Sequence, residues 1–227
     1  MSTAEAFRGF TPEAFAWFAG LEADNSRDYF ARTRPLFEDR VRGELEALLD
    51  ELCDEVGGRD VKVFRQHRDL RFSADKSPYK TRTYGVIVGA PGGALYAEVS
   101  AAGLYAGTGY YRMARDQLER FRDAVAAEET GPALASAVAA TRGAGLRVDG
   151  ATLKTAPRGY PRDHPRVELL RHTSVISGRR LGPEGGIGRA AALDHVGGTW
   201  RAAGPVNAWL DEHVGPSTLP PDPRGRR

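Results

Sequence analysis

The spacing of apolar residues changes near residue 60, and this change limits the folds open to the chain. Between residues 37 and 56 apolar side chains recur every three or four positions, which is typical of one helix face, and "GG" at 57–58 ends the pattern. From residue 61 to residue 111, short strand-like runs follow one another with short links. Such links favour an antiparallel meander over strand–helix–strand units.

Further helices are predicted on both sides of the strand region. "TPE" at 11–13 is a helix start, with a hydroxyl N-cap, a proline at the first helical position and an acid in the first turn. Asn25 or Ser26 can cap a second helix, and helical spacing returns over residues 113–142. We therefore expect an α+β fold with a mostly antiparallel central sheet, on which N-terminal helices and a mid-chain helical pair pack.

The C-terminal half gives shorter signals. "LRVDGATLKTAP" predicts a strand or two, "DHPRVELLRH" a short capped helix with Pro165 in its first turn, "TSVISGRRL" another strand, and residues 201–214 a last helix. "GPSTLPPDPRGRR" has four prolines and no hydrophobic periodicity. Residues 215–227 are therefore expected to form a disordered tail after a single α+β domain over residues 1–214.

Composition removes several classes of protein from consideration. With 227 residues, 41% hydrophobic and 27% charged, the chain is expected to be globular, with no signal peptide and no membrane span. Cys53 is the only cysteine and is expected to be buried in a protein of the reducing cytoplasm. Five scattered histidines give no zinc spacing, and the glycine-rich pieces lack the context of a nucleotide-binding turn. No metal, cofactor or membrane partner is therefore expected.

Residues 64–82, here called the basic motif, gather positive charge, although the net charge of the chain is only +2. Any preference for anions is therefore local. The chain has four lysines against 28 arginines, and three of the four lysines fall between residues 62 and 80. The cations of the motif are Arg65, Arg68, Arg71, Lys76, Lys80 and Arg82, and its acids are Asp69 and Asp75.

Two interpretations of the basic motif stay open. Guanidinium groups grip phosphate or carboxylate through paired hydrogen bonds, and lysine adds a point charge, so the excess of cations favours an anion site. Alternatively, Arg68 and Arg71 pair with nearby acids, or with glutamates of the preceding helix, and form an internal ion-pair network. In a regular strand over residues 61–72 the charged and apolar side chains would not separate cleanly, so a bulge near residues 68–69 is expected.

Three stretches resemble the signature blocks of a bacterial and fungal family that is catalogued as domain of unknown function 2461. They are "FRQHRDLRFSADKSPYKT", "LKTAPRGYPRDHPRVELLRH" and "SGRRL". The resemblance implies membership over nearly the whole chain and no particular activity. The hallmark residues that it implies are Arg65, Arg68, Asp69, Arg71, Ser73, Asp75, Lys76, Pro78, Tyr79, Lys80, Lys154, Arg158, Gly159, His164 and Pro165. His67 stands where the family usually has an aromatic or aliphatic residue, which argues against a catalytic role for it.

The second block supplies further candidate site residues. Lys154, Arg158, Asp163 and His164 are hypothesised to approach the basic motif. His164 lies at the start of a predicted helix, so an N-terminal cap is its ordinary alternative role, and the same holds for Asp163.

The favoured function is binding of a phosphate- or carboxylate-bearing small molecule, and turnover of that ligand stays open. The motif's arginines and lysines would hold the anion and Tyr79 would orient it. Asp69 and Asp75 are the only nearby candidates for a general base, and both are expected to pin arginines instead. The alternatives are a nucleic-acid-binding module, suggested by tyrosines at 105, 110 and 111 beside arginines, and a structural or interaction domain without a ligand. The tyrosines are also ordinary residues of a half-buried sheet.

Overall fold

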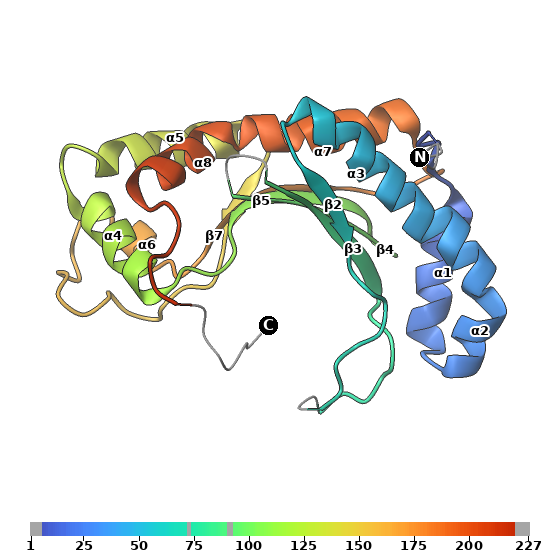
Figure 1. Cartoon of the computed structure of the whole chain (residues 1–227). Helices are drawn as coiled ribbons and strands as arrows, with labels where there is room; N and C mark the ends of the chain where they lie inside the picture. Colours follow the sequence, from blue (N-terminus) through green and yellow to red (C-terminus); the bar gives the residue numbers. More distant parts are fainter. Residues whose placement is uncertain (1–5, 72–73, 90–92, 221–227) are drawn as a thin grey trace. The chain divides into compact units, whose positions relative to one another are not determined.

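The computed structural model describes residues 6–71, 74–89 and 93–220 of the chain (Figure 1). They form two compact units. The first unit comprises the residues up to 107 together with 178–201, and the second comprises 108–177 together with the residues from 202 onward. The expectation of one domain over residues 1–214 stays a prediction. No helix within the described ranges is long and apolar enough to cross a membrane.

The N-terminal helices of the first unit begin where the sequence predicted. Its helices are α1 (Pro12–Ala23), α2 (Arg27–Leu36), a π-helical stretch (Phe37–Gly43), α3 (Glu44–Glu55) and α7 (Arg189–Ala202). Ser26 caps α2, since its hydroxyl accepts a hydrogen bond from the Tyr29 N–H at 3.0 Å. The helix runs past Pro35 without a break, and Gly57, with φ +67°, follows the end of α3.

Antiparallel pairing dominates the six-stranded sheet, as the short links predicted. Its strands, in spatial order, are β2 (Asp60–Val63), β3 (Arg82–Val88), β4 (Ala94–Ser100), β5 (Gly103–Tyr110), β7 (Val175–Leu181) and β6 (Arg147–Asp149). Val86 pairs with Tyr96 in the β3–β4 register. A separate two-stranded sheet joins β1 (Gly9–Phe10) to β8 (Ile187–Gly188). The α+β prediction is confirmed.

One face of the first unit's sheet lies against helices and forms the core. Figure 1 shows α3 and α7 on the same side of these strands. Leu49 of α3 approaches Gly85 of β3, and the indole N–H of Trp200 in α7 donates to the Gly107 carbonyl at 3.1 Å. Because side chains alternate along a strand, every second residue of β3 and β4 points away from these helices.

The second unit has its own apolar core. It contains α4 (Arg115–Ala126), α5 (Gly131–Gly143), α6 (Val167–Leu170) and α8 (Gly204–His213), together with β6. Phe121 and Trp209 pack edge to face, with their ring centroids 6.1 Å apart. Arg166 is largely buried, and its guanidinium donates to the carbonyl groups of Val125 and Ala126 at the end of α4. These orphan carbonyls of the helix end are thereby satisfied.

The prediction of a strand over residues 61–72 was wrong beyond Val63. Only one isolated bridge, between His67 and Tyr79, follows β2 in the described part of this segment. The buried side chain of Gln66 explains the departure, because its amide donates to the carbonyl of Lys80 and its oxygen accepts from the Thr83 hydroxyl. A side chain that bonds the backbone in this way offers an alternative to the strand ladder. Phe72 and Ser73 lie outside the described residues, as do residues 90–92 of "APGGA", a sequence that favours a hairpin turn.

In the C-terminal half, one helix prediction needs correction and one helix was missed. The helix predicted over "DHPRVELLRH" has only four residues, Val167–Leu170, because the chain turns tightly before it, with the His164 N–H bonded to the Pro161 carbonyl. Helix α7 was not predicted at all. It contains Gly197 and Gly198, which lower helix propensity, and tertiary packing overrides that preference.

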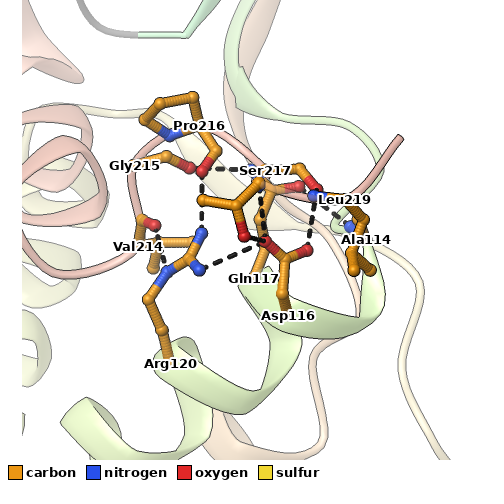
Figure 2. Close-up of polar contacts among 10 residues, drawn as sticks. Ala114, Asp116, Gln117, Arg120, Val214, Gly215, Pro216, Ser217 and Leu219 are labelled. Atoms are coloured by element: carbon orange, nitrogen blue, oxygen red, sulfur yellow. Dashed lines mark hydrogen bonds and ion pairs between the residues drawn. The ribbon is translucent and has the colours of Figure 1, made fainter. Parts of the chain in front are cut away.

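Residues 215–218 belong to the segment 215–227, for which a disordered tail was predicted, and in the structure they contact α4. Figure 2 shows them packed against α4. The Asp116 carboxylate accepts hydrogen bonds from the Ser217 hydroxyl at 2.7 Å and from the Thr218 N–H at 2.8 Å. Arg120 donates to the carbonyls of Val214 and Pro216. Side chains of α4 thus bind backbone groups of a proline-rich segment. Contacts of this kind leave no hydrophobic periodicity in the sequence, so they could not be predicted from it. Residues 221–227 lie outside the described residues.

Asp116→Asn should make the protein melt at a lower temperature at pH 7, and the difference should close in acid. The Thr218 N–H, the Ser217 hydroxyl and Arg120 lower the pKa of Asp116 below its ordinary 3.8. A carboxyl whose pKa is lower in the folded state contributes stability that is complete above its unfolded pKa and is lost as pH falls through the folded value. Melting temperatures of both proteins between pH 7 and pH 2 test this. Glu119→Gln, on the exposed side of the same helix, should leave the melting temperature almost unchanged. A difference in melting temperature between the wild type and Asp116→Asn that stays the same at every pH would contradict the argument.

Candidate functional site

The basic motif forms an irregular hairpin that leads from β2 into β3. The Arg68 N–H donates to the Pro78 carbonyl at 2.9 Å, and the Lys80 N–H donates to the Gln66 carbonyl at 3.0 Å. These bonds flank the His67–Tyr79 bridge and hold the two arms of the hairpin together. The motif is therefore a defined structure within the first unit.

The hairpin is attached to the N-terminal helices through Tyr79. The Asn25 side chain bonds both the N–H of Tyr79, at 3.0 Å, and its carbonyl, at 3.1 Å. The Tyr79 ring is only 5% exposed and stacks on Phe30, with centroids 4.2 Å apart and planes 12° apart. These contacts give Tyr79 an anchoring role, whereas the sequence suggested that it orients a ligand.

The two acids of the motif bind its arginines. The Asp69 carboxylate accepts from Arg71 Nε at 3.0 Å and Nη2 at 2.7 Å, a two-pronged pair, and this lowers its pKa to about 2. Asp75 accepts from the Ser77 hydroxyl and N–H and from Arg68, and these bonds lower its pKa as well. Carboxyls with lowered pKa values are weak bases, so neither acid suits proton abstraction.

Of the four other cations of the hairpin, Arg82 pairs with Glu98, and the remaining three make no ion pair with a carboxylate in the described part of the chain. Lys76 Nζ donates to the Leu70 carbonyl at 3.1 Å, and Lys80 Nζ donates to the Arg65 carbonyl at 2.6 Å. Burial, and then the charges of Arg65 and Arg82, lower the pKa of Lys80. The internal-network interpretation thus accounts for Arg68 and Arg71, whereas Arg65, Lys76 and Lys80 have no carboxylate at ion-pair distance among the described residues.

The residues of the second signature block lie in the second unit. Lys154 and Arg158 are exposed and form no ion pair with the residues described, and Asp163 is likewise exposed. His164 Nδ1 accepts from the Arg166 N–H at 3.0 Å, which is a local turn bond of the capping kind. The basic motif belongs to the first unit and this block belongs to the second, so the approach of the block to the motif stays a hypothesis.

The sheet face opposite α3 and α7, here called the open face, carries a row of aromatic rings. Phe64 follows β2, Tyr84 lies on β3, Tyr96 on β4 and Tyr105 on β5. Their successive centroid separations are 4.9, 5.5 and 6.1 Å. All four residues are half-buried, so the rings pack against one another and retain exposed area. Three neighbouring strands each contribute one ring, and the residue directly after β2 contributes the fourth.

Cations lie over three of these rings. Lys62 Nζ is 5.1 Å from the Phe64 centroid, Lys80 Nζ is 4.8 Å from that of Tyr84, and the Arg180 guanidinium carbon is 5.3 Å from that of Tyr105. A cation within about 6 Å of an aromatic face is attracted by the ring's electron density. The rings therefore position the positive charges along the open face.

Glu98 fixes the centre of the open face. It is 6% exposed, and its carboxylate binds Arg180 Nη2 at 3.0 Å, Arg82 Nε at 3.4 Å and the Tyr96 hydroxyl at 2.7 Å. Burial, followed by the Glu98 charge, raises the pKa of Tyr96 well above its ordinary value, so its hydroxyl stays protonated and donates to Glu98. Arg180 also donates to the Ser100 hydroxyl at 3.1 Å. The guanidinium groups are thus held in fixed orientations.

The open face joins two signature blocks that are far apart in the sequence. Lys80 and Arg82 come from the basic motif, and Arg180 comes from "SGRRL". Sequence reasoning missed Tyr84, Tyr96, Glu98 and Arg180 as site residues. The third block was a signal for Arg180, whereas the alignment of the rings depends on the strand register.

The fold and site define an α+β protein whose central sheet presents a cationic and aromatic face. A family model described as "Conserved hypothetical protein (DUF2461)" matches residues 13–209 of this chain. The chain belongs to that family, and the predicted membership is confirmed. A search of curated proteins gives no match. The description of the family states no activity, so function must be argued from the open face and the basic motif.

Proposed function

We propose that this protein binds a phosphate- or carboxylate-bearing ligand on the open face and the adjoining basic motif. The observation that carries the proposal is that Arg82 and Arg180 share one buried carboxylate, Glu98, while Lys80 lies over the ring of Tyr84, the cross-strand partner of Glu98. One carboxylate cannot neutralise these cations together with Lys62, so positive charge remains for an external anion. We also propose that the protein functions in the reducing cytoplasm, in keeping with its one buried cysteine.

Within this proposal the residues of the basic motif have different roles. Arg68 and Arg71 with their acids keep the hairpin in shape, and Tyr79 attaches it to the helices. Lys80, Arg65 and Lys76 supply charge to the ligand. Lys154, Arg158 and His164 of the second block stay candidates for the same ligand. No general base is assigned, because Asp69 and Asp75 are both engaged with arginines.

Lys80→Met should weaken binding of inorganic tripolyphosphate by about tenfold, the loss expected for one charge-assisted contact. Methionine keeps the apolar stem of Lys80 over Tyr84 and leaves no carboxylate without a partner. Isothermal titration at low salt measures the affinity. Arg201→Met removes one positive charge from α7, where Arg201 pairs with Glu55, and it should leave the affinity unchanged. Equal weakening by the two variants, or no binding by the wild type, would reject the proposal.

A further inference from the structure

We infer that the ligand of the open face is single-stranded nucleic acid, with bases on the aromatic row and phosphates on the flanking cations. This inference rests on the proposed anion binding and names its ligand class. The rings of Phe64, Tyr84, Tyr96 and Tyr105 form a continuous row with centroid separations of 4.9 to 6.1 Å. Rings interleaved with cations are the arrangement that proteins use for single strands, because every base has a face that stacks.

A ligand that contacts the cations at both ends of the open face must be extended. Lys62 lies on β2 and Arg180 on β7, the first and fifth strands in the spatial order. Four strand spacings of about 4.8 Å separate them by about 19 Å. A phosphate group bonds donors within about 3 Å, so no single phosphate reaches both ends. A chain of linked phosphates does reach both, and a strand of a few nucleotides has the required length.

The rings favour nucleic acid over an acidic peptide. Carboxylates along a peptide would gain from the cations and nothing from the aromatic row, whereas bases stack on rings and on guanidinium planes. An antiparallel sheet whose neighbouring strands carry rings is also the platform on which one common class of RNA-binding domain stacks two or three bases. The open face has the same elements: an antiparallel sheet, rings on successive strands and cations beside them.

Fluorescence anisotropy with a labelled 12-mer of deoxythymidine and one of uridine tests the inference. The wild type should bind, and the logarithm of the association constant should fall with the logarithm of salt concentration with a slope of about −2 to −3, as expected for three or four phosphates. Tyr84→Leu keeps apolar bulk and removes the ring, whose exposed part a base would contact and over which Lys80 lies, so it should weaken binding about tenfold. Tyr29→Leu alters a half-buried tyrosine of α2, outside the aromatic row, and it should leave the affinity unchanged. Tyr105→Leu replaces Tyr84→Leu if that variant does not fold.

Competition separates this inference from the proposed function. Inorganic polyphosphate and poly-glutamate of similar charge should displace the oligonucleotide only at much higher charge concentration. If polyphosphate binds as tightly as the oligonucleotide and Tyr84→Leu has no effect, anion binding stands and the nucleic-acid inference is overturned. Tighter binding of poly-glutamate would likewise overturn it and indicate an acidic protein partner. If none of these polyanions binds, both the inference and the proposed function fail.

Discussion

Gly103→Ala is expected to lower the free energy of unfolding by about 4 kcal/mol or more, an unusually large loss for one methyl group. Gly103 begins β5 with φ +103°, a backbone conformation that L side chains rarely adopt. A Cβ at this position would lie 2.1 Å from the Leu181 carbonyl oxygen and 3.1 Å from Gly182 backbone atoms of the neighbouring chain segment. Since backbone cannot swing aside, β5 and β7 would have to separate.

Urea unfolding followed by tryptophan fluorescence measures this loss, with Trp17 and Trp200 as reporters in the first unit. Gly188→Ala is the matched control, because a Cβ there meets nothing within 4 Å and its φ lies outside the left-handed region. It should change the unfolding free energy by no more than about 0.5 kcal/mol. A loss below about 1 kcal/mol for Gly103→Ala would show that the β5–β7 pair adjusts at little cost.

The effect of Gly103→Ala should extend to the open face. The Gly103 carbonyl accepts a hydrogen bond from Arg180 Nη1 at 3.4 Å, and the same guanidinium binds Glu98. A displaced β5–β7 pair would move Arg180 away from both partners. The cationic site and the sheet thus depend on the same close approach of two strands.

Local signals predicted the elements that are fixed by neighbouring residues. Proline at the first position of α1, the Ser26 cap of α2 and the glycine after α3 act within one helical turn, so they can be read directly from sequence. The antiparallel arrangement of β3, β4 and β5 likewise follows from the short links between these strands. The fold class therefore followed from the order of short-range patterns.

Features that depend on distant residues were not predicted. The side chain of Gln66 ends the strand ladder after β2 by bonding to Lys80 and Thr83, and nothing near residue 66 in the sequence announces those partners. Likewise, α7 forms despite Gly197 and Gly198 because its Trp200 and Val196 are buried against the sheet. Tertiary contacts decided both outcomes against the local preference.

The candidate site likewise has one part that was predicted from neighbouring residues and one part that depends on distant residues. The basic motif was recognised from its composition, and the ion pairs within it, Arg68–Asp75 and Arg71–Asp69, join residues at most seven positions apart. The open face was not recognised, because its rings come from three strands and from the residue after β2, and they align only through the pairing register, such as Tyr84 opposite Glu98. A tyrosine in one strand is ordinary; the row exists only once the strands are paired.

Phe30→Ala is expected to cost about 3–5 kcal/mol of unfolding free energy and to loosen the basic motif selectively. Phe30 is 8% exposed, packs against Trp17 and Phe37, and stacks on Tyr79. Its removal leaves a cavity under the hairpin and takes away the stacking partner of Tyr79, while the Asn25 bonds to the Tyr79 backbone remain. Phe30→Leu keeps most of the volume without the ring, so it should cost about 1.5 kcal/mol.

Hydrogen exchange separates anchoring of the hairpin from a general loss of stability. In Phe30→Ala, the amides of Arg68 and Lys80, which bond across the hairpin, should exchange faster at a pH and temperature where the β3–β4 amides remain protected. Phe30→Leu should show the same pattern in weaker form, because Tyr79 then rests on a smaller apolar surface. If all of these amides accelerate together, Phe30 stabilises the unit as a whole, and the basic motif owes its shape to its own ion pairs and to Asn25.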